Sequence, residues 1–329
     1  MDLDDYFISK REEYIMDSFK FQSGDVLNNV SVEYMTFGTP KYDDNGCINN
    51  AIVYCHGSLG NYASVSKLCP LSYTGGPFDK KEFFIISLSE LGAPGSCSPS
   101  TTNLNNSFPK YSIEDMVNFQ NKFLKDKFGI THVRGIIGNS MGGFVALTCA
   151  VLYPDYADFI ISGASGYKVA GRNYILSKLV DEIISTDGDY DSGKNTSSLV
   201  RTLRLATQAV YSFGISKEAL HKIPNSQLDV EFDEFGDEGL LDSIFDVKYC
   251  NDATLDYDIE KDLNKIRSKV LIIGINQDQY FPPNLDAIPM HNLIEDSELI
   301  IYDSDLGHIG FRELETIEKE LSEFMKNFR

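Results

Sequence analysis

The stretch Val133–Tyr153, VRGIIGNSMGGFVALTCAVLY, decides the fold of this chain. It begins with a short apolar run, passes through the glycine-rich segment 138–143 and continues with apolar residues at helical spacing. A strand, a sharp turn around a serine and a helix are the context of a nucleophile elbow, G-x-S-x-G. Gly138 and Gly142 flank Ser140 because a turn this tight leaves no room for side chains at those positions. The pentapeptide alone also fits an ordinary strand-to-helix turn.

The composition excludes several classes of function. The 329 residues suit one large α/β domain with an insertion or two small domains, and 42% of them are hydrophobic. With a formal net charge of −20, the chain lacks the basic stripe that binds nucleic acid. It also has no apolar run of roughly 18 residues, and its acidic start lacks the pattern of a secretory signal. We therefore expect a small-molecule substrate, with neither nucleic acid nor membrane as a partner.

The cysteines indicate a reducing compartment. None of the six forms a C-x-x-C pair, and several lie in apolar runs that are typical of buried strands or helices. Interpreted as buried free thiols, they predict a cytoplasmic protein. The cysteines and the five histidines show no metal-ligand spacing, so neither a metal nor a bound cofactor is expected.

Apolar strand patterns alternate with helical patterns along most of the chain. This alternation predicts a mostly parallel sheet with helices on both faces. An amphipathic pattern over Phe311–Phe328 predicts a closing helix. The predicted strands are Val30–Phe37, Ala51–Cys55, Phe83–Leu88, Val133–Ile137, Asp158–Ser162, Lys269–Ile275 and Glu298–Tyr302.

The pattern changes between Gly166 and Lys261. This block lacks buried strand runs, and Tyr174–Ile184 and Ser198–Phe213 have helical spacing. Residues 229–262 contain thirteen Asp and Glu and two Lys, a net charge of −11, which we interpret as a solvated outer face. The predicted domains are an inserted helical cap at residues 166–261 and an α/β core made of residues 1–165 and 262–329.

Three predicted strand ends carry the residue types of a catalytic triad. Parallel α/β sheets place their sites at the carboxyl ends of strands. Ser140, Asp278 and His308 follow three such ends in the chain order that α/β-hydrolases use. A serine hydroxyl needs a base, and His308 can accept its proton near neutral pH. Asp278 would orient the imidazole, with Asp303 and Asp305 as alternatives for that role.

A predicted strand that ends in His56-Gly57 marks the expected oxyanion hole. In an α/β-hydrolase, one donor is the backbone N–H of the residue after the nucleophile, and the other is a backbone N–H of the loop that follows this strand in the sequence. The backbone N–H groups of Met141 and Ser58 occupy those positions. The alternative is a plain glycine turn. We expect His56, which follows the strand, to shape this turn by hydrogen bonding.

With these residues the chain resembles the homoserine O-acetyltransferase branch of the α/β-hydrolase superfamily, from about Phe21 to the C-terminus and most weakly in the cap. The resemblance implies an α/β-hydrolase fold, with a mostly parallel sheet of the eight-stranded type and an inserted helical cap. It also implies a triad of Ser140, Asp278 and His308, with acetyl-CoA as a co-substrate. The matching segments are Phe21-Gln22-Ser23-Gly24, Tyr34, Phe37-Gly38, Cys55-His56, Phe108-Pro109, residues 112–117 with Gln120, the elbow Gly138–Gly143, Tyr153-Pro154, Phe281-Pro282 and Asp305-Leu306-Gly307-His308.

The resemblance also implies residues that recognise the substrate. The family binds the substrate carboxylate with an arginine of a cap helix, which a tyrosine follows seven residues later. Arg204 and Tyr211 have this spacing, and Arg201 is an alternative to Arg204. A guanidinium suits this role because it can bind both carboxylate oxygens.

Two features depart from the family pattern. The family has an acidic residue directly after the catalytic histidine, which meets the ammonium group of the substrate, whereas this chain has Ile309. The loop that is rich in Gly-Thr-Thr-Gly-Pro in the family reads Gly95-Ser96-Cys97-Ser98-Pro99-Ser100 here. Both departures argue against homoserine as the acceptor.

The sequence therefore predicts a serine acyl-transfer enzyme that acts on a small acyl ester or thioester. One version is an O-acetyltransferase that uses acetyl-CoA, which Arg204 favours. The other is a carboxylesterase that uses water as the acceptor, which Ile309 favours. A non-catalytic binding protein on a hydrolase fold is a further alternative, although a complete triad argues against it. A homodimer is compatible with the sequence.

Overall fold

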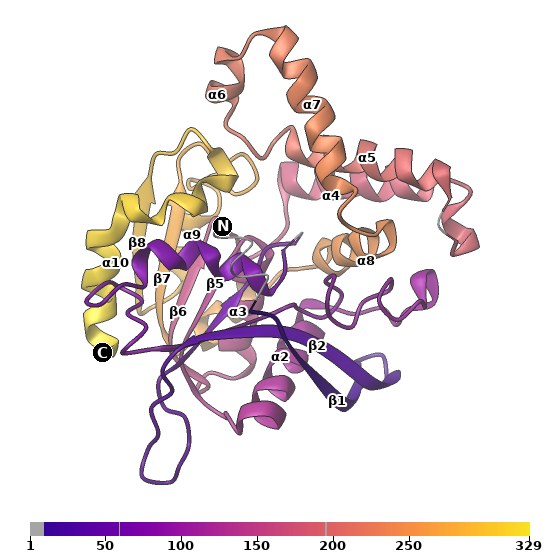
Figure 1. The fold of residues 1–329 in the computed structure, drawn as a ribbon. Coiled ribbons are helices and arrows are strands. Elements are labelled where there is room, and N and C mark those ends of the chain that lie inside the picture. The colour runs from indigo at the N-terminus through magenta and orange to yellow at the C-terminus, as the bar shows by residue number, and fades with distance from the viewer. Residues whose placement is uncertain (1–9, 59, 195) are drawn as a thin grey trace.

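The structure, a computed structural model, describes residues 10–58, 60–194 and 196–329. These residues form one eight-stranded sheet with the order β1-β2-β4-β3-β5-β6-β7-β8 (Figure 1). β2 is antiparallel to β1 and β4, and all other neighbours are parallel, which confirms the predicted sheet. The strands are β1 Glu12–Lys20, β2 Val26–Gly38, β3 Ala51–Cys55, β4 Phe84–Leu88, β5 Val133–Asn139, β6 Ala157–Gly163, β7 Lys269–Ile275 and β8 Ser297–Tyr302.

The edge strand β1 was not expected from the sequence. Its residues include Glu12, Glu13 and Asp17, and strands of the core normally lack such charges. Only Met16 and Phe19 of this strand are fully buried. Because β1 pairs with β2 alone, its outer side remains open to solvent and tolerates the acidic residues.

Helices cover both faces of the sheet, as predicted. Val53 and Cys55 of β3 point into one hydrophobic cluster, while Ile52 and Tyr54 point into the other, as strand geometry requires. The first cluster receives side chains from α2 (Ile113–Phe128), α3 (Met141–Leu152) and α9 (Ala287–Leu293). The second receives them from the 3₁₀ helices η1 (Tyr62–Leu71) and η5 (Gly307–Ile317) and from α10 (Glu318–Met325).

The C-terminal segment is not the single helix that the sequence predicted. It consists of η5, α10 and the short η6 (Lys326–Phe328). Glu313 interrupts η5 with non-helical angles, φ −106° and ψ 36°, and its carboxylate accepts a hydrogen bond of 2.5 Å from the hydroxyl of Ser304. This tertiary contact outweighs the local helical pattern. The break leaves Phe311 and Leu314 both buried against the sheet.

A helical cap connects β6 to β7 (Figure 1). The predicted helices 174–184 and 198–213 are present as α4 (Gly171–Ser185) and α5 (Ser197–Tyr211), which pack with α8 (Ile244–Leu255) around their own apolar cluster. α8 also contributes residues to the main core, so the exact division at 166–261 stays a prediction. The other helical elements of the cap are η3 Tyr190–Ser192, α6 Lys217–Lys222, α7 Asn225–Gly239 and η4 Glu260–Lys265.

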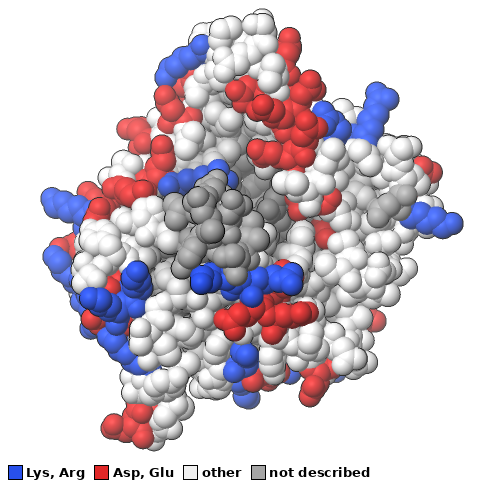
Figure 2. All heavy atoms as spheres, in the orientation of Figure 1, with Lys and Arg blue, Asp and Glu red and all other residues white. Residues whose placement is uncertain are grey.

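The acidic residues of the cap lie in two different environments. Those of α7 are solvated, as predicted, and Figure 2 shows them gathered along this helix. Asp246 on α8 is buried, so the prediction of a solvated face is wrong for this residue. Its carboxylate accepts hydrogen bonds from the Ser98 hydroxyl at 3.1 Å and the Ser100 backbone N–H at 2.8 Å. These bonds join the cap to a loop of the core.

The structure also shows the state of the cysteines, the surroundings of possible metal ligands and the character of the helices. All six cysteines are free thiols; Cys47 is exposed, Cys69 is half-buried, and the other four are buried. Within residues 10–58, 60–194 and 196–329, no three His, Cys, Asp or Glu side chains gather as metal ligands. None of the helices in these ranges has the length and apolar character needed to cross a bilayer.

Candidate active site

The turn between β5 and α3 has the backbone of a nucleophile elbow. Ser140 adopts φ 55° and ψ −125°, a conformation that L-residues rarely occupy. A Cβ at Gly138 would lie 2.0 Å from the carbonyl oxygen of Gly142, and a Cβ at Gly142 would lie 2.1 Å from that of Cys55. Both glycines are therefore required by contact with backbone. The Ser140 N–H donates to the Gly163 carbonyl at 3.0 Å, which ties the turn to β6.

Ser140, His308 and Asp278 form one chain of hydrogen bonds. His308 Nε2 lies 3.0 Å from Ser140 Oγ, and His308 Nδ1 lies 2.8 Å from Asp278 Oδ2. The Asp278 side chain has no exposed area, and its Oδ1 accepts bonds from the backbone N–H groups of Tyr280 and Phe281. A carboxylate at Nδ1 places a proton on that nitrogen and leaves Nε2 free to accept the serine proton.

The two alternative acids lie elsewhere. Asp303 is bound by the side-chain amides of Asn276 and Gln277 at 2.9 and 3.0 Å. Asp305 is exposed and forms an ion pair with Lys222 at 3.0 Å. The loop after β7 thus brings Asp278 to His308, while the loop after β8 directs its carboxylates outward.

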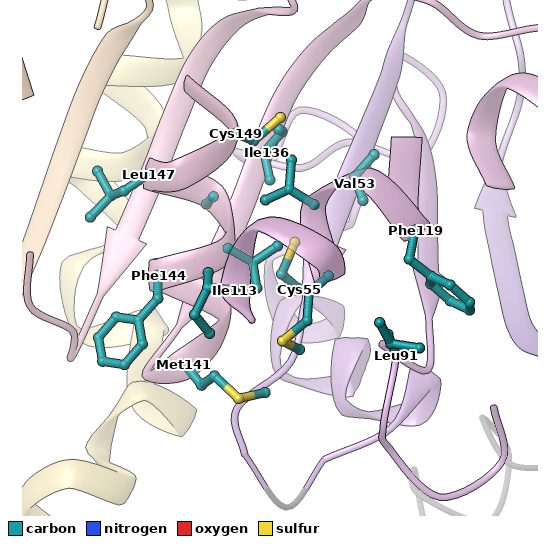
Figure 3. Packing of buried hydrophobic residues seen from close by; sticks show 14 of the residues in the cluster. Val53, Cys55, Leu91, Ile113, Phe119, Ile136, Met141, Phe144, Leu147 and Cys149 are labelled. Atoms are coloured by element: carbon teal, nitrogen blue, oxygen red, sulfur yellow. The ribbon is translucent and has the colours of Figure 1, made fainter. Parts of the chain in front are cut away.

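The predicted oxyanion residues lie beside Ser140. Ser58 and Met141 both line the cavity into which Ser140 opens. Met141 is the first residue of α3, so its N–H has no acceptor within the helix and is available to a ligand. Its side chain packs with Cys55 and Phe144 in the hydrophobic cluster below the elbow (Figure 3). The N-terminus of α3, with its partial positive charge, therefore lies next to Ser140.

His56 holds the loop that contains Ser58. One ring nitrogen, Nδ1, lies 2.7 Å from the Gly57 carbonyl, and Nε2 lies 3.0 Å from the N–H of Glu90. The first contact requires a donor and the second an acceptor, which defines the neutral tautomer. Burial lowers the pKa of His56 to about 4, in agreement with a neutral ring. The expectation that His56 shapes this turn by hydrogen bonding is confirmed.

A cavity of about 310 Å³ lies between the core and the cap, and its size suits a small ligand. The core contributes Ser58, Ser140 and His308, and the cap contributes Tyr211, as the sequence predicted. Tyr211 stacks on Phe235 of α7 with ring centroids 5.5 Å apart.

The structure does not bring Arg204 to this cavity. Arg204 faces α7, where it forms ion pairs with Asp237 and, at 3.6 Å, with Asp233. Neither Arg204 nor the alternative Arg201 is among the residues that line the cavity. The spacing from Arg204 to Tyr211 places both side chains on the face of α5 that meets α7, but only Tyr211, at one end of the helix, lines the cavity.

Sequence reasoning missed two cations that do line the cavity, Lys67 of η1 and Arg312 of η5. Arg312 follows His308 by four residues, which was the available signal for its position. Ile309, the residue that departs from the family pattern, also lines the cavity.

The family follows from comparison with known proteins. A profile described as the alpha/beta hydrolase fold matches residues 50–313. The chain belongs to this family. The match covers most of the sheet and both loops that carry Asp278 and His308, and it confirms the predicted fold of this α/β-hydrolase.

Two relatives of this α/β-hydrolase show where it lies within the family. A probable acyltransferase of Methanothermobacter thermautotrophicus is 43% identical over 299 residues, which cover 91% of this chain and 92% of the relative. A homoserine O-acetyltransferase of Haemophilus influenzae is 27% identical and covers 88% of this chain and 90% of its own length. These relatives confirm the predicted resemblance.

Solved structures share the fold at low sequence identity. An acetylester hydrolase from Corynebacterium glutamicum has a TM-score of 0.82 at 22% identity, with 96% of each chain covered. A homoserine O-acetyltransferase from Bacillus anthracis has a TM-score of 0.81 at 20% identity and covers 96% of this chain and 97% of its own. The fold, cap included, is thus found both in a transferase and in a hydrolase.

Proposed function

We propose that this α/β-hydrolase transfers an acyl group through an ester on Ser140. The hydrogen-bonded series from Ser140 through His308 to Asp278 is the observation that carries the proposal. The strained backbone at Ser140 supports it as well, because strain of this kind gathers at functional sites.

In the proposed first step, Ser140 Oγ attacks the carbonyl carbon of the acyl donor while His308 Nε2 takes the hydroxyl proton. The negative charge that develops on the carbonyl oxygen would be stabilised by the backbone N–H groups of Met141 and Ser58. The tetrahedral intermediate then collapses, and the leaving thiolate or alkoxide receives the proton from His308. Asp278 stabilises the imidazolium between these two transfers.

In the second step, His308 removes a proton from the acceptor, which attacks the acyl ester. The tetrahedral intermediate then expels Ser140 Oγ, which receives that proton from His308, so that the free enzyme is restored. We propose a hydroxyl compound as the acceptor and acetyl-CoA as the donor, because the relative at 43% identity is a probable acyltransferase and the relative at 27% identity is a homoserine O-acetyltransferase. The helical cap over the cavity supports this choice, since a covered site limits the access of water.

Esterase activity is the second candidate, and Ile309 is the observation that favours it. This apolar side chain lines the cavity next to His308 and cannot form an ion pair with the ammonium group of homoserine. With no suitable acceptor bound, water would resolve the acyl-enzyme by the same chemistry.

Labelling and product analysis test the proposed function. A fluorophosphonate probe should modify Ser140, and Ser140→Ala should abolish both labelling and hydrolysis of 4-nitrophenyl acetate. Release of CoA from acetyl-CoA that requires a hydroxyl acceptor would identify a transferase, whereas ester hydrolysis without use of acetyl-CoA would identify an esterase. A native chain that is neither labelled nor active would leave only the non-catalytic alternative.

The proposed setting of this chemistry is the cytoplasm, which the six free cysteines support. The homodimer stays a prediction, and light scattering of the purified protein checks it.

A further inference from the structure

The cavity beside Ser140 has a charge opposite to that of the whole molecule. The chain carries a formal net charge of −20. Yet the described residues that line the cavity include Lys67 and Arg312 and no Asp or Glu. A cavity lined by two cations and no carboxylate attracts anions and disfavours a ligand that carries a positive charge.

Arg312 presents an uncompensated charge to this cavity. It lies one turn of 3₁₀ helix after Ile309, so the two side chains share a face of η5. Among the residues that the structure describes, Arg312 has no acidic partner within ion-pair distance, although it acts electrostatically on the hydroxyl of Tyr211. This contrasts with Arg204, which two aspartates of α7 neutralise.

Lys67 adds a second charge from a neighbouring helix. Among its contacts, its ammonium donates to the backbone carbonyl of Ser64 at 3.3 Å. Because η1 packs against η5, Lys67 and Arg312 belong to one rigid part of the core. Both therefore keep their positions relative to His308 even if the cap moves.

The same cavity offers little to an ammonium group. The residue after His308 is the apolar Ile309, which also packs near Gly214 of the cap. Two carboxylates, Glu238 and Asp242, act on the Tyr211 hydroxyl, but both lie outside the lining of the cavity. An amino acid would thus bring its ammonium group into a wall without an anion.

We propose that Arg312, assisted by Lys67, binds a carboxylate of the substrate, and that this substrate is a small hydroxy acid or its ester without an ammonium group. The inference rests on the proposed acyl transfer through Ser140. The carboxylate belongs either to the acceptor or to the acyl group, and both sources offer the same anion to the guanidinium.

Two pairs of probes distinguish these sources. Homoserine and 4-hydroxybutyrate differ only in the ammonium group, and they test the acceptor after the enzyme has been acetylated by 4-nitrophenyl acetate. The singly charged 4-nitrophenyl succinate, compared with 4-nitrophenyl acetate, tests the acyl group. We expect 4-hydroxybutyrate to exceed homoserine about tenfold in kcat/KM, because the ammonium group of homoserine would lose its hydration in a wall that carries cations and no carboxylate. Alternatively, 4-nitrophenyl succinate should exceed the acetate about tenfold, as one charge-assisted hydrogen bond provides.

Substitution then assigns the effect to Arg312. Arg312→Gln should raise KM for the preferred carboxylate probe about tenfold, with a far smaller effect on neutral 4-nitrophenyl acetate. Arg312→Lys should restore part of the loss. Arg267→Gln removes the same charge from an exposed site that does not line the cavity, and it serves as the matched control.

Binding provides a readout that does not depend on turnover. In a Ser140→Ala background, calorimetry should detect 4-hydroxybutyrate or succinate, and adding Arg312→Gln should weaken that affinity about tenfold. A preference for homoserine would overturn the proposed substrate without an ammonium group, and equal losses on charged and neutral probes would overturn the role of Arg312. Absence of 4-nitrophenyl acetate hydrolysis in the native chain, with carboxylate binding retained, would instead refute the acyl transfer while leaving the anion site in place.

Discussion

At the scale of single residues, Ser140 combines strain with reactivity. Its left-handed backbone costs about 1–3 kcal/mol for a residue with a Cβ and nothing comparable for glycine. We expect Ser140→Gly and Ser140→Ala to be equally inactive, since both lack Oγ. The glycine variant should be more stable than the alanine variant by about 1 kcal/mol, after the larger chain entropy of glycine is subtracted. Urea unfolding of the two variants measures this difference, and equal stabilities would show that the turn is unstrained.

Glu90 behind the oxyanion loop predicts an unusual dependence of stability on pH. Burial raises the pKa of its carboxyl to about 8, and neither carboxyl oxygen accepts a well-formed hydrogen bond from a described residue. The neighbouring Cys55 thiol lowers this pKa only in part. Because the folded state holds the proton more tightly than the unfolded state, Glu90 lowers stability as pH rises from about 4.5 to about 8.

Glu90→Gln should remove this dependence. As pH rises through that window, the difference in unfolding free energy between the variant and the native chain should shift in favour of the variant by up to about 1.4 kcal/mol per pH unit. Urea unfolding at pH 5 and pH 8 measures the gain. The amide adds its own buried polar group, but that cost is the same at both pH values. A stability difference that does not change with pH would contradict a protonated Glu90.

At the scale of elements, Asp246 fastens α8 to the core loop 98–100. Asp246→Ala removes the acceptor of the Ser100 N–H and one of the partners of the Ser98 hydroxyl, which keeps its bond to Thr101, so it should cost about 1–3 kcal/mol. We expect a lower melting temperature and faster hydrogen exchange in α8 and the loop. Asp229→Ala on the exposed face of α7 is the matched control and should change neither.

The cap and the sheet differ in how far local pattern predicts them. Core strands such as β3 and β7 coincide closely with apolar runs of the sequence, because both their faces are buried. β1 and the break at Glu313 were missed, because an edge strand needs few apolar residues and the break depends on the contact with Ser304. Arg204 has the correct spacing for the cavity, yet packing against α7 turns it away.

At the scale of the whole molecule, burial of the thiols predicts their reactivity. Burial raises the pKa of Cys97, Cys149 and Cys250 to about 12, and that of Cys69 less, so their thiolates are scarce at neutral pH. We expect Ellman's reagent to titrate Cys47 rapidly in the native protein and Cys69 more slowly, and all six thiols after denaturation. Cys47→Ser should remove the fast phase. Rapid reaction of several thiols in the native state would show a looser core.

The sequence by itself determined the elbow, the parallel sheet and the residues that converge on Ser140. It could do so because glycine contacts and apolar strands are local, and because parallel strands deliver their ends to one edge. Only the tertiary structure decided which charges meet the ligand. Arg312 faces the cavity and Arg204 faces α7. Asp246 is buried, although it lies in an acidic segment whose sequence predicts a solvated surface. Those outcomes depend on how distant helices pack, which no local pattern encodes.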